Sequence, residues 1–178
     1  MEEKTKAPFW KPAFIYGGLL GLLSIFLGLV FYFLGLSTES WVGYIGMAIG
    51  IAVLVYILLH YRKEYLGGFA SFGQMFFMAF MVGVISAIIN AVYTYVLYTA
   101  IDPGLIDIIK IAAEEKIMSN PRIPESMYDS IFERMEKRMT AQRMTTMAVI
   151  GGIVINTILG LIIAAFVKKE EAPVNSAV

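Results

Sequence analysis

Four long stretches without a charged residue constrain this chain more than any other feature of its sequence. They cover residues 13–36, 42–61, 65–101 and 144–167. Each has about 20 residues or more, and an α-helix of that length crosses the ~30 Å hydrocarbon core of a bilayer. We therefore predict an all-α integral membrane protein with four transmembrane helices, packed as a four-helix bundle with the lipid bilayer as its surroundings.

The overall composition supports this class and excludes several others. Hydrophobic residues make up 58% of the 178 residues and charged residues only 16%, against roughly 25% charged residues in soluble domains. A disordered chain and a soluble enzyme are excluded as first interpretations. Fourteen basic residues balance fourteen acidic ones, so no net charge attracts nucleic acid. The absence of cysteine excludes disulfides and thiolate metal sites.

The charged residues divide the chain into five segments. We expect a polar N-terminal tail at 1–12, three spans within 13–101, a helical polar segment at 102–143, a fourth span at 144–167 and a C-terminal tail at 168–178. The third charge-free stretch is too long for one straight span. Its span proper is expected at about 74–99, with residues 67–73 at the membrane interface.

The positions of the positive charges indicate the orientation. The two sides of the predicted membrane carry seven Lys plus Arg residues each, so the raw count ties. Only Arg143 adjoins a span on the side of the polar segment, whereas five basic residues do so on the side of the termini. Positive charge beside span ends marks the cytoplasmic side, so we expect both termini to be cytoplasmic. The five residues are Lys11, Arg62, Lys63, Lys168 and Lys169.

The segment at 102–143 has the pattern of two amphipathic helices separated by a Pro-rich break at 120–124. No helix-breaking residue lies between the second helix and the fourth span, so we expect the two to be continuous. One face of the second helix carries an apolar stripe. The stripe is expected to pack on the first helix; a partner or self-association surface is the main alternative, and a soft-metal site a weak one. Its members are Met127, Ile131, Met135 and Met139.

Small residues recur along the spans at helical spacing. In membranes, close approach at small residues holds helices together, because burial of apolar surface gives no advantage over lipid. The stripes on spans three and four predict that these helices touch, with a dimer interface as the competing interpretation. Spans one and two offer Gly17, Gly21, Gly46 and Gly50 for the same purpose. The stripe residues are Ala79, Gly83, Ala87, Ala91, Gly152 and Gly160.

A second line of residues on span three is polar. Asparagine facing hydrocarbon is costly, so these side chains are expected to face protein. They serve either as interhelical hydrogen-bonding contacts or as the lining of a small polar pathway, with Asn156 as the counterpart on span four. The predicted intramembrane polar contacts are Gln74, Ser86, Asn90, Thr94 and Asn156.

Residues for catalysis or coupled transport are missing from the spans. No Asp, Glu, Lys or Arg lies within them, and proton-coupled carriers need such groups at membrane depth. His60 is the only histidine and lies at a span end. We therefore expect no enzyme activity, no catalytic residues, no metal site and no cofactor.

The stretch from His60 to Pro103 resembles an uncharacterised family of bacterial membrane proteins, catalogued as domain of unknown function 4199. The matching features are a glycine-containing loop, the pair Phe72-Gly73, an aromatic-rich third span and a closing Asp102-Pro103. The resemblance covers residues 10–168. It implies a small multi-span protein of the bacterial inner membrane, and it brings no activity or ligand with it.

These observations lead to two functional hypotheses. The first is a structural or accessory subunit that acts through helix packing and through the helical segment outside the membrane, as a homo-oligomer or with a membrane-protein partner. The alternative is an oligomeric channel or carrier for a small neutral solute, lined by the polar residues of span three. A continuous polar cavity would favour the second hypothesis, and a dry, closed bundle would favour the first.

Overall fold

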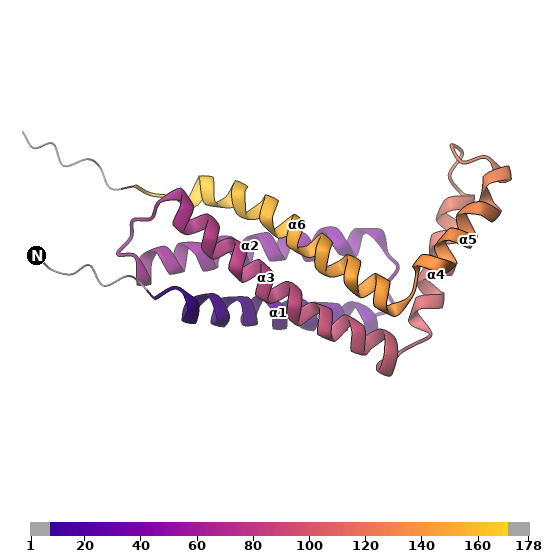
Figure 1. Ribbon diagram of the computed structural model, residues 1–178, viewed down its shortest axis with the longest axis horizontal. Coiled ribbons are helices and arrows are strands. Elements are labelled where there is room, and N and C mark those ends of the chain that lie inside the picture. The colour runs from indigo at the N-terminus through magenta and orange to yellow at the C-terminus, as the bar shows by residue number, and fades with distance from the viewer. Residues whose placement is uncertain (1–7, 171–178) are drawn as a thin grey trace, which may run out of the picture.

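The computed structural model describes residues 8–170. Four long helices run side by side in it (Figure 1): α1 (Trp10–Phe33), α2 (Ser40–Tyr65), α3 (Phe72–Val96) and α6 (Ala141–Val167). A π-helical turn, η1 (Leu97–Ile101), extends α3. All four are long and apolar enough to cross a membrane. The predicted class, an all-α multi-pass membrane protein, is confirmed. Most of the two predicted tails, Lys4 and Lys6 included, lies outside the described residues.

Helix α3 is the central element of the fold. It makes most of its helix–helix contacts with α6 and α1, whereas α2 touches α1, α3 and α6 more sparsely. The reason lies in the side chains at the contacts, since the close approaches of α3 are made at glycine and alanine positions. Helix α2 is therefore the least tightly held of the four.

The four helices are packed most densely in the half nearest the chain termini, here called the terminal end. Leu54 and Leu58 of α2 and Met75, Met78 and Val82 of α3 are almost completely buried there. None of these side chains carries an oxygen or nitrogen atom, so they form an apolar layer, here called the dry layer, between the middle of the long helices and the terminal end.

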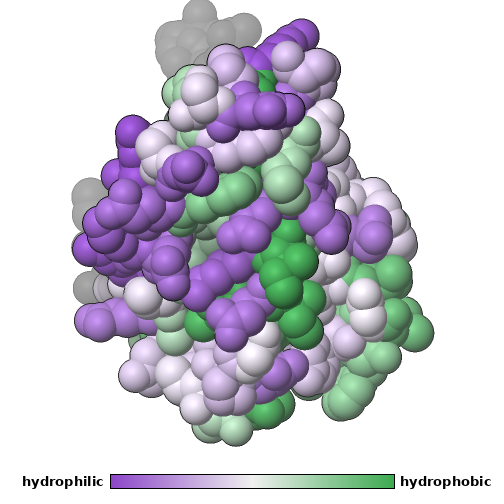
Figure 2. Space-filling view, turned by 90° about the vertical axis from the view of Figure 1, so that its right-hand side faces the viewer, coloured by the Kyte–Doolittle hydropathy of each residue, from purple (hydrophilic) through white to green (hydrophobic). Residues whose placement is uncertain are grey.

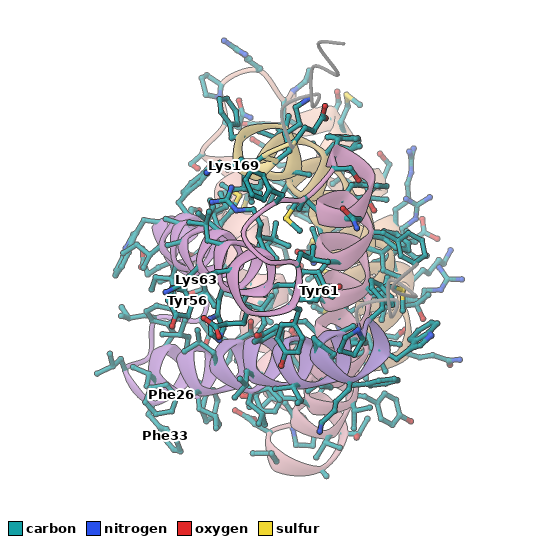
Figure 3. The ribbon with its side chains drawn as sticks, turned by 90° about the vertical axis from the view of Figure 1, so that its left-hand side faces the viewer. Phe26, Phe33, Tyr56, Tyr61, Lys63 and Lys169 are labelled. Carbon is teal, nitrogen blue, oxygen red and sulfur yellow. The ribbon has the colours of Figure 1, made fainter. Side chains whose placement is uncertain are left out.

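Figure 3 looks onto the terminal end. Tyr61 lies inward and is 3% exposed, whereas Phe26 and Phe33 point outward. Outward aromatic and aliphatic side chains are ordinary for a surface that meets lipid.

Two contacts close the terminal end. The backbones of Ala70 and Lys169 exchange two hydrogen bonds of 2.8 and 3.0 Å, so the α2–α3 loop is tied to the end of α6. Arg62 donates a hydrogen bond from Nη1 to the carbonyl of Val167. Gly67 and Gly68 make the preceding turn with φ of +64° and +90°, a conformation that favours glycine.

A helical hairpin occupies the opposite end, here called the hairpin end. It consists of α4 (Leu105–Met118), a short 3₁₀ turn η2 (Glu125–Met127) and α5 (Tyr128–Arg138). Helix α4 runs across the axis of the long helices (Figure 1), and polar side chains gather over this end, with apolar ones exposed beside them (Figure 2).

Two sets of hydrogen bonds hold α4 against the ends of the long helices. Tyr32 donates from its hydroxyl to Asp102 Oδ2 at 2.9 Å. Lys116 donates to the carbonyl of Thr38 at 3.1 Å and to Ser40 Oγ at 2.9 Å. The start of α4 is thus fixed to α1, and its end to the beginning of α2.

The expected continuous helix from the polar segment into the last span is wrong. Helix α5 ends at Arg138, and α6 begins at Ala141. Between them Met139 has ψ of +66°, and Thr140 is extended and caps α6 by accepting a hydrogen bond from the Arg143 amide. Threonine is a preferred N-cap residue, so the break had a signal in the sequence that a search for Gly and Pro overlooks.

A candidate binding cavity among the four long helices

A cavity of about 370 Å³ lies among the four long helices, in the half nearer the hairpin. All four contribute to its wall: α1 through Leu20 and Ser24, and α2, α3 and α6 through segments within 43–54, 86–94 and 148–159. Leu54, which is 1% exposed, lies where the cavity meets the dry layer of the terminal end. The cavity is therefore closed on that side.

Polar side chains from three helices meet at this cavity. Ser86, Asn90 and Thr94 of α3 line it together with Asn156 of α6 and Ser24 of α1. The positions are one helical turn apart on α3, so the three side chains share one face. Four of the five residues predicted as intramembrane polar contacts thus lie at one place.

The two asparagines do not bond to each other. Asn90 donates from Nδ2 to the carbonyl of Ser86, and Asn156 donates from Nδ2 to the carbonyl of Gly152, both at 2.9 Å and both within their own helix. Among the described residues, neither Oδ1 atom receives a hydrogen bond. Each carboxamide therefore keeps an acceptor free at the cavity.

Ser86 is the most deeply buried of the polar lining residues. It is 5% exposed, and no hydrogen-bond partner of its hydroxyl lies within the described part of the chain. Because Ser86 lines the cavity, its hydroxyl is available to a molecule bound there.

Gln74 is the predicted polar residue that the structure places elsewhere. It is exposed in the first turn of α3, far along the helix from Ser86. Its side chain accepts from the Ser71 amide at 2.8 Å, while Ser71 Oγ accepts from the Gln74 amide. This reciprocal pair caps the helix, which explains a glutamine at a span end.

The small residues of α3 and α6 lie where these helices come closest. A Cβ atom built on Gly83 would lie 2.6 Å from the Cβ of Asn156, and one built on Gly160 would lie 3.2 Å from the Cβ of Ala79. At Gly152 the corresponding distance to the Ala87 Cβ is 3.6 Å. Ala91 lies further along α3, at the cavity wall.

The glycines of α1 and α2 differ sharply. Added Cβ atoms on Gly17 and Gly21 would come within 2.7 and 3.0 Å of Ile85 and Ile89 of α3. By contrast, no atom of the described residues lies within 4 Å of a Cβ built on Gly43, Gly46 or Gly50 of α2, and all three line the cavity. The expectation that Gly46 and Gly50 pack closely against another helix is wrong. Both glycines border the cavity instead.

The apolar stripe of 127–139 is partly covered, and one of its members lies beside α4. Ile131, Met135 and Met139 are half-buried, whereas Met127 is exposed. Met135 shares a cleft between α4 and α5 with Ile111 and Phe132. Within residues 8–170, no three His, Asp or Glu side chains gather as they would around a metal ion.

Sequence reasoning missed two features of the site. Ser24 joins the polar lining from α1, where it donates from Oγ to the carbonyl of Leu20 at 2.9 Å. As the only serine in an otherwise apolar span, Ser24 could have been singled out from the sequence. The glycines of α2 that line the cavity could not, because spacing alone does not tell a packed glycine from one that borders space.

The fold and this site define a multi-pass helical membrane protein with an uncharged internal cavity, closed toward the terminal end. The chain matches the family described as Protein of unknown function (DUF4199) over residues 15–169, and it belongs to that family. The resemblance carried by residues 60–103 is thereby confirmed. No curated protein and no solved structure matches the chain.

Proposed function

We propose that this protein binds a small uncharged molecule in the cavity, within the inner membrane of a bacterium, and that it is not an enzyme. The observation that carries the proposal is the convergence of Ser86, Asn90 and Asn156 on one uncharged cavity, where neither amide oxygen accepts a hydrogen bond from the described residues. Binding sites for small molecules are concave, mostly apolar, and contain a few convergent polar groups. The cavity has these properties.

The absence of charge along the wall supports an uncharged ligand. None of the residues that line the cavity is Asp, Glu, Lys, Arg or His. A charged ligand at membrane depth would be left without a counter-ion in a medium of low dielectric constant, which is costly. A neutral ligand with hydrogen-bonding groups meets no such penalty.

The dry layer of the terminal end supports binding rather than conduction. A channel or carrier would need to continue the polar path past Leu54, toward Leu58, Met75 and Met78. These side chains are at most 1% exposed and offer no oxygen or nitrogen atom. We therefore infer a site that binds its ligand without conducting it across the membrane, as an accessory protein would.

A second candidate is an accessory role through the hairpin. Ile111 of α4, Met118 at its end and Met127 are about half exposed although they lie beyond the long helices. Exposed apolar side chains of this kind suit a protein partner or a second copy. Chemical cross-linking in membranes tests this role: an Ile111→Ser/Met118→Ser variant should lose cross-links that the Ser126→Ala control retains.

We further propose that both termini are cytoplasmic and the hairpin lies outside the cytoplasm. Arg62, Lys63, Lys168 and Lys169 cluster at the terminal end, beside the ends of α2 and α6, and positive charge beside spans marks the cytoplasmic side. The chain has no cysteine, so a maleimide will react only with a cysteine that is introduced by substitution. Ser126→Cys should react with an impermeant maleimide on intact cells, and Ser71→Cys only after lysis; the reverse pattern would overturn the orientation.

Thermal unfolding in lipid nanodiscs tests the binding function. Glycerol, urea and 1-dodecanol serve as uncharged probes, with acetate and tetramethylammonium as charged ones. At least one uncharged probe should raise the melting temperature of the wild type, because a ligand stabilises the state that binds it. Gly46→Leu should abolish the shift by filling the cavity.

Gly18→Leu is the matched control, since an added Cβ at Gly18 also meets no atom within 4 Å but Gly18 does not line the cavity. It should behave like the wild type. If wild type and Gly46→Leu respond alike to every probe, the cavity is not the binding site.

A further inference from the structure

We propose that the ligand is a neutral, lipid-soluble molecule with a hydroxyl or amide head and an apolar tail, and that it enters sideways from the bilayer between α2 and α6. This inference rests on the proposed binding function and specifies its ligand class. It follows from three features of the cavity: where it opens, what its polar groups lack, and what lies across its aqueous side.

The cavity reaches the outer surface at membrane depth. Met47 of α2 and Ile155 of α6 both line it, and they are 45% and 51% exposed. Ile155 lies near the middle of α6, and at 1.5 Å per residue it is about 20 Å from either helix end. An opening at that position meets hydrocarbon, so a molecule that uses it must be soluble in lipid.

The sparse contacts of α2 agree with such an entrance. Helix α2 touches α6 and α3 far less than α1 and α6 touch α3. Its glycines at 43, 46 and 50 leave space along its inner face rather than contacts. An extended apolar tail fits along this wall and can leave past Met47 without displacing a side chain from a packed contact.

The polar groups of the cavity require a donor. The Oδ1 atoms of Asn90 and Asn156 receive no hydrogen bond among the described residues, and Ser86 lines the same cavity. Unsatisfied acceptors at membrane depth are costly. A ligand head with an O–H or N–H group would pair with them, whereas an alkane or a carboxylate would not.

The aqueous route into the cavity is less direct. Helix α4 lies across the hairpin end (Figure 1), tied down through Asp102 and Lys116. Its residues Leu105 and Ile106 are buried, with exposed fractions of 5% and 9%. A water-soluble solute that enters at this end would have to pass beside α4, and a lipid-soluble one would not.

Photolabelling of the full-length protein in nanodiscs tests the inference. The probe is a diazirine-bearing dodecanol, with the diazirine-bearing dodecanoate of the same length as a matched charged control. Peptide mapping by mass spectrometry should find dodecanol labels on α2 and α6 at the cavity in the wild type and in Gly18→Leu. Excess unlabelled 1-dodecanol should reduce this labelling severalfold, and excess dodecane should not.

Two variants separate the parts of the site. Gly46→Leu should leave only labelling that 1-dodecanol does not compete, because the tail space is filled. Asn90→Leu keeps the opening and should abolish the preference for dodecanol over dodecane as competitor. Asn90 is chosen because Asn156 packs tightly on Gly83, so a change at Asn156 would also disturb the fold.

The outcomes distinguish this inference from the proposed function. If glycerol or urea stabilises the wild type but not Gly46→Leu, and 1-dodecanol does not compete for the label, the binding function holds and the lipid-soluble ligand is overturned. If dodecanoate labels the cavity as well as dodecanol does, the neutral head is overturned. If no probe distinguishes the wild type from Gly46→Leu, both proposals fall.

Discussion

Gly83 of α3 lies directly against Asn156 of α6, so closely that a Cβ atom on Gly83 would stand 2.6 Å from the Cβ of Asn156. This contact brings the two helices together at backbone distance. It also fixes where Asn156 stands at the cavity, since its side chain is wedged against α3 while its Nδ2 group bonds to the carbonyl of Gly152. Asn156 therefore takes part both in the packing of α3 against α6 and in the polar lining of the cavity.

The first prediction concerns this contact. Gly83→Ala should lower the free energy of unfolding by about 1–3 kcal/mol, the usual range for overpacking a close contact. Gly151→Ala on α6 is the control, because an added Cβ there meets no atom within 4 Å. Unfolding in mixed micelles measures both variants, and equal stability of the two would contradict the close approach of α3 and α6.

The second prediction separates the role of Asn90 in stability from its role in binding. Its Nδ2 group bonds only to its own helix, at the carbonyl of Ser86. Asn90→Leu should therefore change the free energy of unfolding by less than about 1 kcal/mol, which is the typical net value of one hydrogen bond. The same unfolding assay checks this, and a large loss would mean that Asn90 holds two helices together.

The third prediction concerns the attachment of the hairpin. Tyr32→Phe removes the hydrogen bond to Asp102 Oδ2 and should loosen the attachment of α4 to α1. Tyr44→Phe is the matched control, since Tyr44 is 69% exposed. Hydrogen exchange of the α4 amides should rise in Tyr32→Phe alone. Unchanged exchange in both variants would show that this bond does not hold α4.

The fourth prediction concerns the break between α5 and α6. Thr140→Ala removes the cap that accepts from the Arg143 amide and should cost about 1 kcal/mol. Exchange should rise in the first turn of α6. The control is Thr146→Ala, whose hydroxyl only donates back to the carbonyl of Gln142. A single uninterrupted helix in the wild type would contradict the capped break.

The long helices could be predicted from the sequence because their signal is large and local. A stretch of more than 20 residues without charge, such as 144–167, has few alternatives to a span. The line Ser86, Asn90 and Thr94 could be placed on one face for the same reason, since helical spacing alone decides it.

Other features depend on residues that are distant in the sequence, so they could not be predicted from the sequence. Gly21 and Gly46 lie in similar apolar surroundings in the sequence, yet one meets Ile89 and the other borders empty space. Which neighbour a glycine faces is set by the tertiary arrangement, not by its own span. Gln74 shows the same limit, because its value as a helix cap appears only where the helix begins.

The most direct test of the binding cavity is an intermolecular NOE measurement in nanodiscs between methyl-labelled protein and the uncharged probes glycerol, urea and 1-dodecanol. Leu54 lines the cavity and Leu58 does not, although both are buried beyond the reach of bilayer lipid. We predict contacts from at least one probe to the Leu54 methyl groups and none to those of Leu58. No contact to Leu54 from any probe, or equal contact to both residues, would contradict the account.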